Sequence, residues 1–385
     1  MADRTTQSRS RSSDDAYTIR QYDSGDRDGV LSLYETVFDD SRGDGEWFDW
    51  KFVDNPYHPG VPIFVAEQDG DVVGVRPSLP LPLSVGGERE LALVQVDPMV
   101  HPDHRRQGLF TRLAAAVYDH YGPREPSIVV GFPNEAVKGG LEKLAEKLSL
   151  DEGVLEPFTE YYRVQNLPAV VDADEAKPVD RLANALNPGV EGYLTARDRV
   201  GTPRTEGRIE RHSGAPAALL AEVAERRPTP HASAMRDRTF LEWRFRNPRY
   251  AYATYVLRRS GVPVAALVVG EQRNVEPDIV HVSDALPTSG GRRRDERLSR
   301  LLGRVVADYA DADVVAAAGR TVPRAVLASN GFVANDRFPL SRLTATYWFS
   351  ARPLTDEDVD EWVVNGHHLT DVDSWNLSFC ELEVG

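Results

Sequence analysis

The sequence predicts a mixed α/β protein made of two copies of one fold in tandem, each a mostly antiparallel mixed sheet flanked by helices. Strand-like alternation and helix-like spacing of apolar residues follow one another along the chain. A motif of Trp, a basic residue and Phe, followed by Asn-Pro, occurs twice, at Trp50 and at Trp243. The length of 385 residues is enough for two domains.

In the first copy the expected order is strand, two helices, three strands, helix, strand, helix and two strands. Strands are expected at 17–21, 62–67, 71–83, 88–97, 127–132, 154–158 and 159–165, and helices at 30–38, 46–52, 109–121 and 134–148. The Asp69-Gly70 pair is a turn signal between two of the strands. The strand at 127–132 is nearly all apolar, as expected for a buried position.

The second copy repeats the first. After each Trp motif come a strand, a turn at Gly70 or Gly261, and an apolar strand. We interpret the shared Trp and Asn-Pro elements as core and turn devices, not as catalytic parts. Further elements are expected at 279–286, 297–309, 312–318, 323–330 and 343–350, and the alternating segment 374–384 is expected to add an ordered strand.

These patterns divide the chain into four segments. Residues 1–15 are polar, lack the apolar region of a secretory signal, and are expected to form a disordered tail. The first copy spans 16–167. The segment 168–203 is rich in proline and acidic residues and is expected to be a connector with one helix at 179–186. The second copy spans 204–385.

Composition narrows the possible partners and location. The net charge of −15 argues against nucleic acid as the main partner. No apolar run is long enough for a membrane span. The single cysteine, Cys380, excludes an internal disulfide and predicts a reducing, cytoplasmic location, and we interpret it as an apolar filler. Arginine far exceeds lysine and acidic residues are abundant, which is typical of proteins from halophiles.

The segment from Val94 to Gly122 carries the clearest chemical signal. It runs from an alternating strand through the basic loop His104-Arg105-Arg106-Gln107-Gly108 into an amphipathic helix. Loop amides, the helix dipole and two arginines together predict an anion site with room for more than one phosphate.

This loop resembles a known cofactor loop. Arg105-Arg106-Gln107-Gly108-Leu109-Phe110, preceded by Val100-His101-Pro102, is similar to the acetyl-coenzyme A loop of the GNAT-type N-acetyltransferases, Gln/Arg-x-x-Gly-x-Gly/Ala. Phe110 departs from that pattern, because Gly or Ala is usual there.

The resemblance implies an N-acetyltransferase that uses acetyl-CoA as co-substrate. A small-molecule or peptide amine would attack the thioester directly in a ternary complex. Pantetheine would lie in a gap between the fourth and fifth strands, bonded by the backbone of Met99 and Val100. The amides from Arg105 to Phe110, including Gln107 and Leu109, would hold the pyrophosphate. Asn134 is either a cofactor contact or a helix cap.

The catalytic groups are less clearly marked. Asp97 is the preferred base, with capping of the turn before Pro98 as the alternative. Lys138 stands where relatives carry an aromatic residue that protonates the leaving thiolate, and it is no equivalent acid. No cluster of His, Cys and carboxylates has ligand spacing, so we expect no metal.

The second copy lacks this loop. Its corresponding segment, 287–294, holds glycines and arginines without the motif, so we expect no acetyl-CoA there and a wall of the acceptor cleft instead. Two other function classes stay open. One is a tandem enzyme that takes an aminoacyl group from charged tRNA, and the other is a non-catalytic acyl-CoA-binding module.

Overall fold

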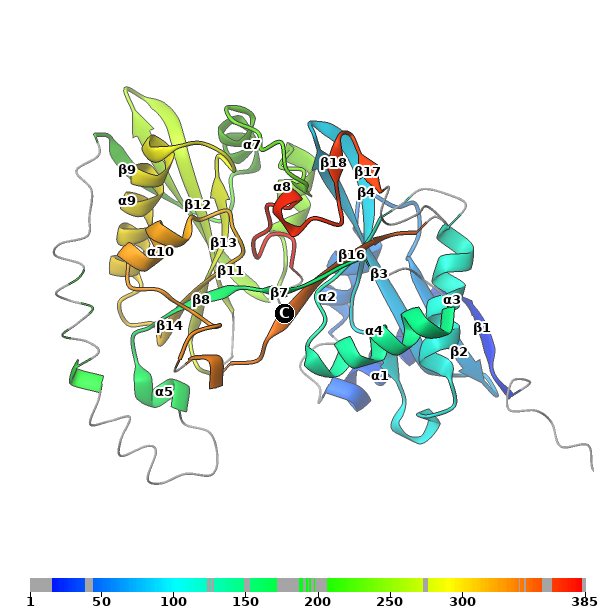
Figure 1. Ribbon diagram of the computed structural model, residues 1–385. Helices are drawn as coiled ribbons and strands as arrows, with labels where there is room; N and C mark the ends of the chain where they lie inside the picture. Colours follow the sequence, from blue (N-terminus) through cyan, green and yellow to red (C-terminus); the bar gives the residue numbers. More distant parts are fainter. Residues whose placement is uncertain are drawn as a thin grey trace, which may run out of the picture.

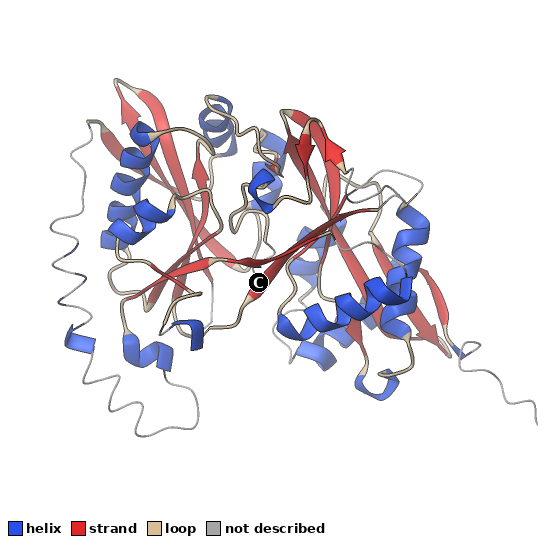
Figure 2. Ribbon diagram, viewed as in Figure 1, coloured by secondary structure: helices blue, strands red, loops and turns tan. Residues whose placement is uncertain are grey.

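A computed structural model gives the structure of the protein, which contains two large sheets side by side (Figure 1). It describes residues 16–38, 44–122, 126, 128–148, 153–171, 187–189, 192, 194, 197, 206–272, 276–338, 340–342, 344–354 and 362–382. The predicted tail at 1–15 and the predicted helix at 179–186 lie outside these residues. Helices cover the outer face of each sheet and also lie between the sheets (Figure 2).

The first sheet follows the order predicted for the first copy, with one strand from elsewhere. Its order is β1 (Thr18–Gln21), β2 (Ile63–Gln68), β3 (Asp71–Val85), β4 (Glu88–Gln95), β6 (Ile128–Gly131), β16 (Tyr347–Pro353) and β7 (Val154–Phe158). The short strands β5 (Met99–Val100) and β10 (Ser233–Ala234) also pair with β3. β4 and β6 are parallel, and the other pairs are antiparallel.

The second sheet has the same plan. Its order is β9 (Arg208–Ser213), β11 (Tyr250–Arg259), β12 (Val262–Gln272), β13 (Ile279–Leu286), β14 (Val314–Ala318), β8 (Glu160–Val164) and β15 (Val333–Ala334). Again the fourth and fifth strands are the parallel pair. The mixed α/β class with two sheets flanked by helices is therefore confirmed.

The two sheets exchange strands. β8 follows β7 directly in the chain but pairs with β14 and β15 of the second sheet. In return β16, from the second half, lies between β6 and β7 of the first sheet. The strand predicted at 159–165 is present but does not close the first sheet, since alternation fixes a strand's faces and not its partner. The boundary at residue 167 stays a prediction.

Helices form layers on both sides of the sheets. They are α1 (Arg27–Phe38), α2 (Gly45–Phe48), α3 (Leu109–Tyr121), α4 (Glu135–Leu148), α5 (Leu167–Val171), α7 (Ala217–Glu225), α8 (Arg238–Arg244), α9 (Arg292–Asp308) and α10 (Arg324–Ser329). Apolar residues of α3 form a core with one face of the first sheet, and those of α9 and α10 form one with the second. A third core joins the inner faces of both sheets with α1, α7 and α8.

The two copies of the Trp motif meet in the middle of the molecule. The rings of Trp50 and Trp243 stack with centroids 5.8 Å apart, and each indole N–H donates to the other residue's backbone carbonyl at 2.8 and 2.9 Å. Asn55 and Asn247 are both buried and each accepts a bond from the amide two residues ahead. The Trp residues therefore pack in the core, and the Asn side chains stabilise turns.

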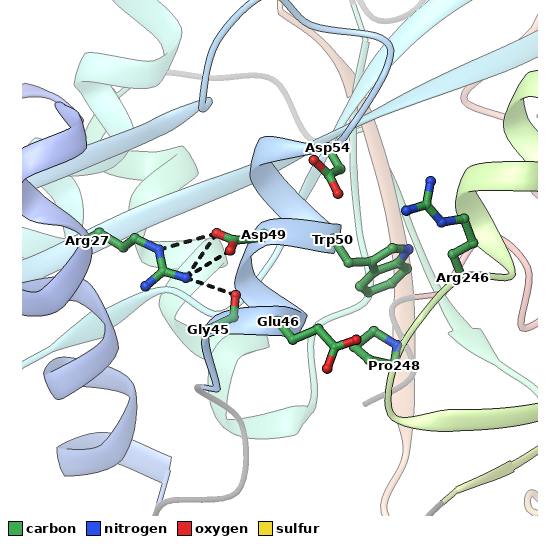
Figure 3. Close-up of a pocket in the computed structure, with 8 residues that line it drawn as sticks. All are labelled: Arg27, Gly45, Glu46, Asp49, Trp50, Asp54, Arg246 and Pro248. Atoms are coloured by element: carbon green, nitrogen blue, oxygen red, sulfur yellow. Dashed lines mark hydrogen bonds and ion pairs between the residues drawn. The ribbon is translucent and has the colours of Figure 1, made fainter.

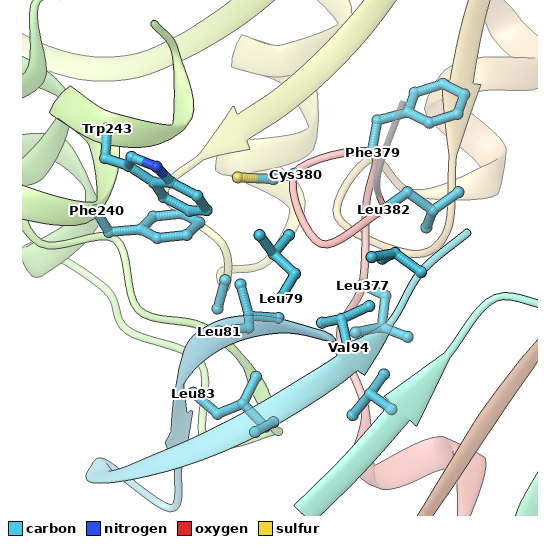
Figure 4. Close-up of a cluster of buried hydrophobic side chains, with 14 of the residues drawn as sticks. Leu79, Leu81, Leu83, Val94, Phe240, Trp243, Leu377, Phe379, Cys380 and Leu382 are labelled. Carbon is cyan, nitrogen blue, oxygen red and sulfur yellow. The ribbon is translucent and has the colours of Figure 1, made fainter. Parts of the chain in front are cut away.

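The C-terminal segment fills the space between the sheets (Figure 4). Phe379, Cys380 and Leu382 are buried against β3, β4 and α8. The strand expected at 374–384 is wrong, because the described part of this segment makes only an isolated bridge at Trp375. The buried Arg244 guanidinium donates to three backbone carbonyls of this segment at 2.8 to 3.0 Å, so side-chain bonds replace a strand ladder.

Candidate functional site

The parallel strands β4 and β6 part at one end. Their pairing runs from Ala92 and Ile128 to Gln95 and Gly131. Beyond Gln95 the backbone turns at Asp97, whose φ is +38°, and β5 continues against β3. The chain after β6 instead leads into α4. The predicted gap therefore lies between Met99–Val100 and the start of α4.

The basic loop lies at one end of this gap. Arg106 and Gly108 adopt left-handed backbone with φ of +63° and +76°, and α3 begins at the next residue, Leu109. The first amides of a helix have no partner inside it and attract anions. A hollow of ≈ 390 Å³ lies here. It is lined by Val37, Pro98, Met99, Val100, His104, Arg105, Arg106, Gly108, Leu109 and Phe110.

The structure thus gathers most of the predicted cofactor residues at one hollow. Of the loop, only Gln107 does not line it. Arg105 donates to the carbonyl of Val100 at 3.2 Å, which ties the loop to β5. The side chains of Arg105 and Arg106 are exposed, so they are open to a ligand from solvent.

A second cavity of ≈ 440 Å³ lies next to the first, and Pro98 lines both. It passes between the strands that part and reaches the second sheet. Residues of the first half that line it include Arg76, Gln95, Asp97, Tyr118, Phe132, Asn134 and Leu141. Residues of β8 and of the second half that line it include Glu160, Tyr162, His281, Tyr347, Arg352, Phe379 and Leu382.

Asp97 lies in this cavity within a buried ion pair. Its carboxylate accepts a bond from Lys51 at 2.8 Å and from the Tyr34 hydroxyl at 3.3 Å. The Lys51 side chain is fully buried, and its ammonium lies 4.4 Å from the centroid of the Trp47 ring. Asp97 therefore has a structural task as counter-ion of Lys51, and its role as base stays a prediction.

Asn134 and Lys138 lie at the start of α4. The Asn134 side chain accepts the Val137 amide at 3.0 Å, so it caps the helix, and it also lines the cavity. The Lys138 ammonium lies 3.4 Å from the Trp348 ring centroid and pairs with Glu142. Its surroundings are those of a surface cation held by an aromatic ring.

Sequence reasoning missed an aromatic hydroxyl beside Asn134. Tyr347 forms a bridge with Asn134 and lines the cavity. It belongs to β16, the strand that the second half contributes. Nothing local in the sequence marks it, because only the strand exchange brings it here.

Glu160 was missed for the same reason. It is buried on β8, lines the cavity from the second sheet, and accepts a bond from the Tyr162 hydroxyl at 2.9 Å. Burial raises its pKa to about 7, and the Tyr162 bond opposes that rise. A carboxyl that titrates near neutral pH inside a cavity suits proton transfer. Burial lowers the pKa of nearby His281 to about 4, so that imidazole is neutral at pH 7.

Another hollow, of ≈ 480 Å³, lies beside Trp50 (Figure 3). Arg27 in its lining is already bonded to Asp49 and to the Gly45 carbonyl. None of the predicted cofactor residues line it. It therefore does not compete with the gap as the cofactor site.

The loop before α9 is built differently from the loop before α3. Arg294 is buried and donates to the backbone carbonyls of Pro287 and Thr321. Its guanidinium thus holds the loop together, while Arg292 is exposed. The expectation that this loop binds no acetyl-CoA stays a prediction.

Three other features bear on chemistry. Within the described ranges no group of three or more His, Cys, Asp and Glu side chains is placed to hold a metal ion. No helix in the same ranges is long and apolar enough to cross a membrane. Cys380 is buried, and burial raises its pKa well above the ordinary value, which favours the thiol over a nucleophilic thiolate.

Comparison with known proteins agrees with this geometry. Residues 18–138, which include β4, the basic loop and β6, match a family model described as an acetyltransferase (GNAT) domain. No curated protein matches the sequence.

Solved structures share the fold over most of the chain. A GCN5-related N-acetyltransferase from Anabaena variabilis aligns with a TM-score of 0.56 and 12% identity, covering 88% of this chain and 73% of that one. An N-myristoyltransferase from Saccharomyces cerevisiae, with bound myristoyl-CoA, aligns with a TM-score of 0.56 and 13% identity, covering 87% and 80%. A probable N-acyltransferase from Enterococcus faecalis aligns at 0.55 and 9%, covering 88% and 72%.

Proposed function

We propose that this protein is an acyltransferase that moves an acyl group from an acyl-CoA to an amine. One observation carries the proposal. The hollow at the basic loop and the cavity behind it adjoin at Pro98, so a donor held by its phosphates at Arg105–Phe110 would reach the cavity through the gap beside Met99 and Val100. Acyl transfer in a ternary complex needs this arrangement of donor and acceptor.

The proposed donor is acetyl-CoA, on the resemblance of the loop. The fold neighbour with bound myristoyl-CoA shows that such a fold also admits longer chains in that enzyme. Apolar residues such as Phe132, Leu141 and Phe379 line this cavity. The length of the acyl chain that the cavity accepts can therefore be measured with acyl-CoAs of different lengths.

Two carboxylates are candidates for the base that removes the ammonium proton. Asp97 is the one predicted from sequence, and Glu160 is the one that the fold adds. We favour Glu160, because Asp97 already serves as the counter-ion of Lys51 and a pKa of about 7 suits a base at neutral pH. Tyr347 is our candidate acid for the leaving thiolate, in place of the aromatic residue that α4 lacks.

The tandem arrangement, cytoplasmic location and halophilic source remain predictions from the sequence. So do the alternatives of a tRNA-dependent transferase and a non-catalytic acyl-CoA-binding module. The net charge of −15 weighs against the first.

A thiol-release assay tests the proposal. The full chain is incubated with acetyl-, butyryl- and myristoyl-CoA and a panel of amines, and free CoA is detected. We expect amine-dependent release that does not require tRNA. Tight acyl-CoA binding by calorimetry without release from any pair would leave the binding module instead. Transfer of an aminoacyl group from charged tRNA to an amine, without release of free CoA, would favour the tRNA-dependent class.

A further inference from the structure

Two arginines in the cavity have no anion to balance them in the described part of the chain. Arg76 is 3% exposed, and its guanidinium donates from Nε to the Gln95 side chain at 2.8 Å. Its Nη1 is buried without a hydrogen-bond partner, and so is Nη1 of Arg352. Both residues line the same cavity.

Both arginines face the α3 side of the first sheet. Arg352 pairs with Val129, which packs against α3, while its neighbour Ala351 faces the core between the sheets. Val75, next to Arg76, also faces that core, so Arg76 points to the α3 side. The Arg76 guanidinium lies 5.1 Å from the Phe110 ring centroid, behind the cofactor loop.

The acidic groups of the cavity lie elsewhere. Asp97 is engaged by Lys51, and Glu160 projects from the second sheet. Burial is the largest influence on the pKa of Arg76, and burial and Arg352 together lower it to about 10 although Tyr118 acts in the other direction. A buried cation without a counter-ion destabilises the folded state, so a bound anion would be favoured beside it.

We propose that Arg76 and Arg352 bind a carboxylate of the substrate inside the cavity. Two guanidinium groups with free N–H bonds suit a carboxylate, which accepts bonds on both oxygens. This deepens the proposed function, on which it rests in part, by giving the substrate an acidic end. The carboxylate comes from one of two sources: an amino-acid-like acceptor or the far end of a dicarboxylic acyl group.

Matched pairs of substrates separate the two sources. Lysine against 1,5-diaminopentane, each with acetyl-CoA, tests the acceptor. Succinyl-CoA against butyryl-CoA, each with one amine, tests the acyl group. In one pair we expect the carboxylate-bearing compound to have a kcat/KM at least ~10-fold higher, the size of a charge-assisted hydrogen bond.

Variants then assign that preference to the arginines. Arg76→Gln and Arg352→Gln should each reduce the ratio within the preferred pair toward one, Arg76→Lys should retain part of it, and the exposed Arg259→Gln should leave it unchanged. The Kd of free CoA should be the same in all four. A loss of CoA affinity in Arg76→Gln equal to its loss of substrate preference would overturn the proposal, because the arginine would then serve the cofactor.

A second measurement does not depend on turnover. Succinate should raise the melting temperature of the wild-type chain above that in sodium chloride of equal ionic strength, and this shift should vanish in Arg76→Gln. In the ligand-free state Arg76→Met should melt no lower than wild type, since it removes an uncompensated charge. No shift with succinate and no preference in either pair would refute the site. A rise of the melting temperature with succinate but no thiol release from any substrate pair would support the anion site and contradict the proposed acyltransferase activity.

Discussion

At the scale of single residues, buried charge decides the roles of the carboxylates. Asp97 was visible in the sequence because it precedes Pro98 at the end of a strand, and the structure gives it Lys51 as a partner. In the sequence Lys51 stands out only as part of a core motif, and its pairing with Asp97, 46 residues away, follows from the fold alone. Local patterns therefore pointed to this carboxylate without revealing the charge that holds it.

Replacement of each carboxylate by its amide separates the two candidate bases. Glu160→Gln should remove the rise of kcat/KM with pH near 7, because the group that must lose its proton is gone. Asp97→Asn should instead lower the melting temperature, since Lys51 would be left buried without its counter-ion. The pH–rate profile and a thermal melt check both. A normal profile in Glu160→Gln together with a lost one in Asp97→Asn would return the role to Asp97.

Glu160 should also affect stability. Its folded pKa of about 7 lies above its ordinary value of 4.5, so the native state binds more protons between those pH values. The free energy of unfolding contributed by this group therefore falls as the pH rises from 4.5 through 7. We expect Glu160→Gln to gain in melting temperature relative to wild type as the pH increases over this window. A constant difference would contradict the assignment of this pKa.

At the scale of elements, the strand pattern was predictable and the partners were not. The alternation around Tyr162 and that before Phe349 gave strands at nearly the right positions. Their exchange between sheets depends on contacts distant in sequence, which no local pattern encodes. The same limit applies to the residues of the candidate site. Met99 to Phe110 could be predicted from a local motif, whereas Glu160, Tyr347 and Arg352 lie on exchanged strands and could not.

The exchange predicts that the first half cannot fold alone. A chain of residues 1–167 lacks β16, so β6 and β7 lose the strand that joins them. We expect no cooperative thermal unfolding and no acetyl-CoA binding from this fragment. As a control, residues 344–354 joined by a flexible linker after residue 158 should restore both in part. A cooperative melt and full CoA binding by the simple fragment would contradict the importance of the exchange.

At the scale of the whole molecule, the acidic composition predicts that stability depends on salt. The net charge of −15 makes the compact state repel itself at low ionic strength, and salt screens this repulsion. We expect the melting temperature to rise between dilute buffer and molar potassium chloride. A flat melting temperature over that range would remove the halophile interpretation.

Calorimetric titration of acetyl-CoA into the wild-type chain and Gly108→Val tests the central claim most directly. Gly108 has a φ of +76°, which valine adopts poorly, and the space beside its Cα is open in the direction where a side chain would meet the phosphates. We predict micromolar-range binding by wild type and none by Gly108→Val, and a loss of about 3 kcal/mol when Arg105 and Arg106 are both changed to Ala. Equal affinity in wild type and both variants would contradict an acyl-CoA site at the N-terminus of α3.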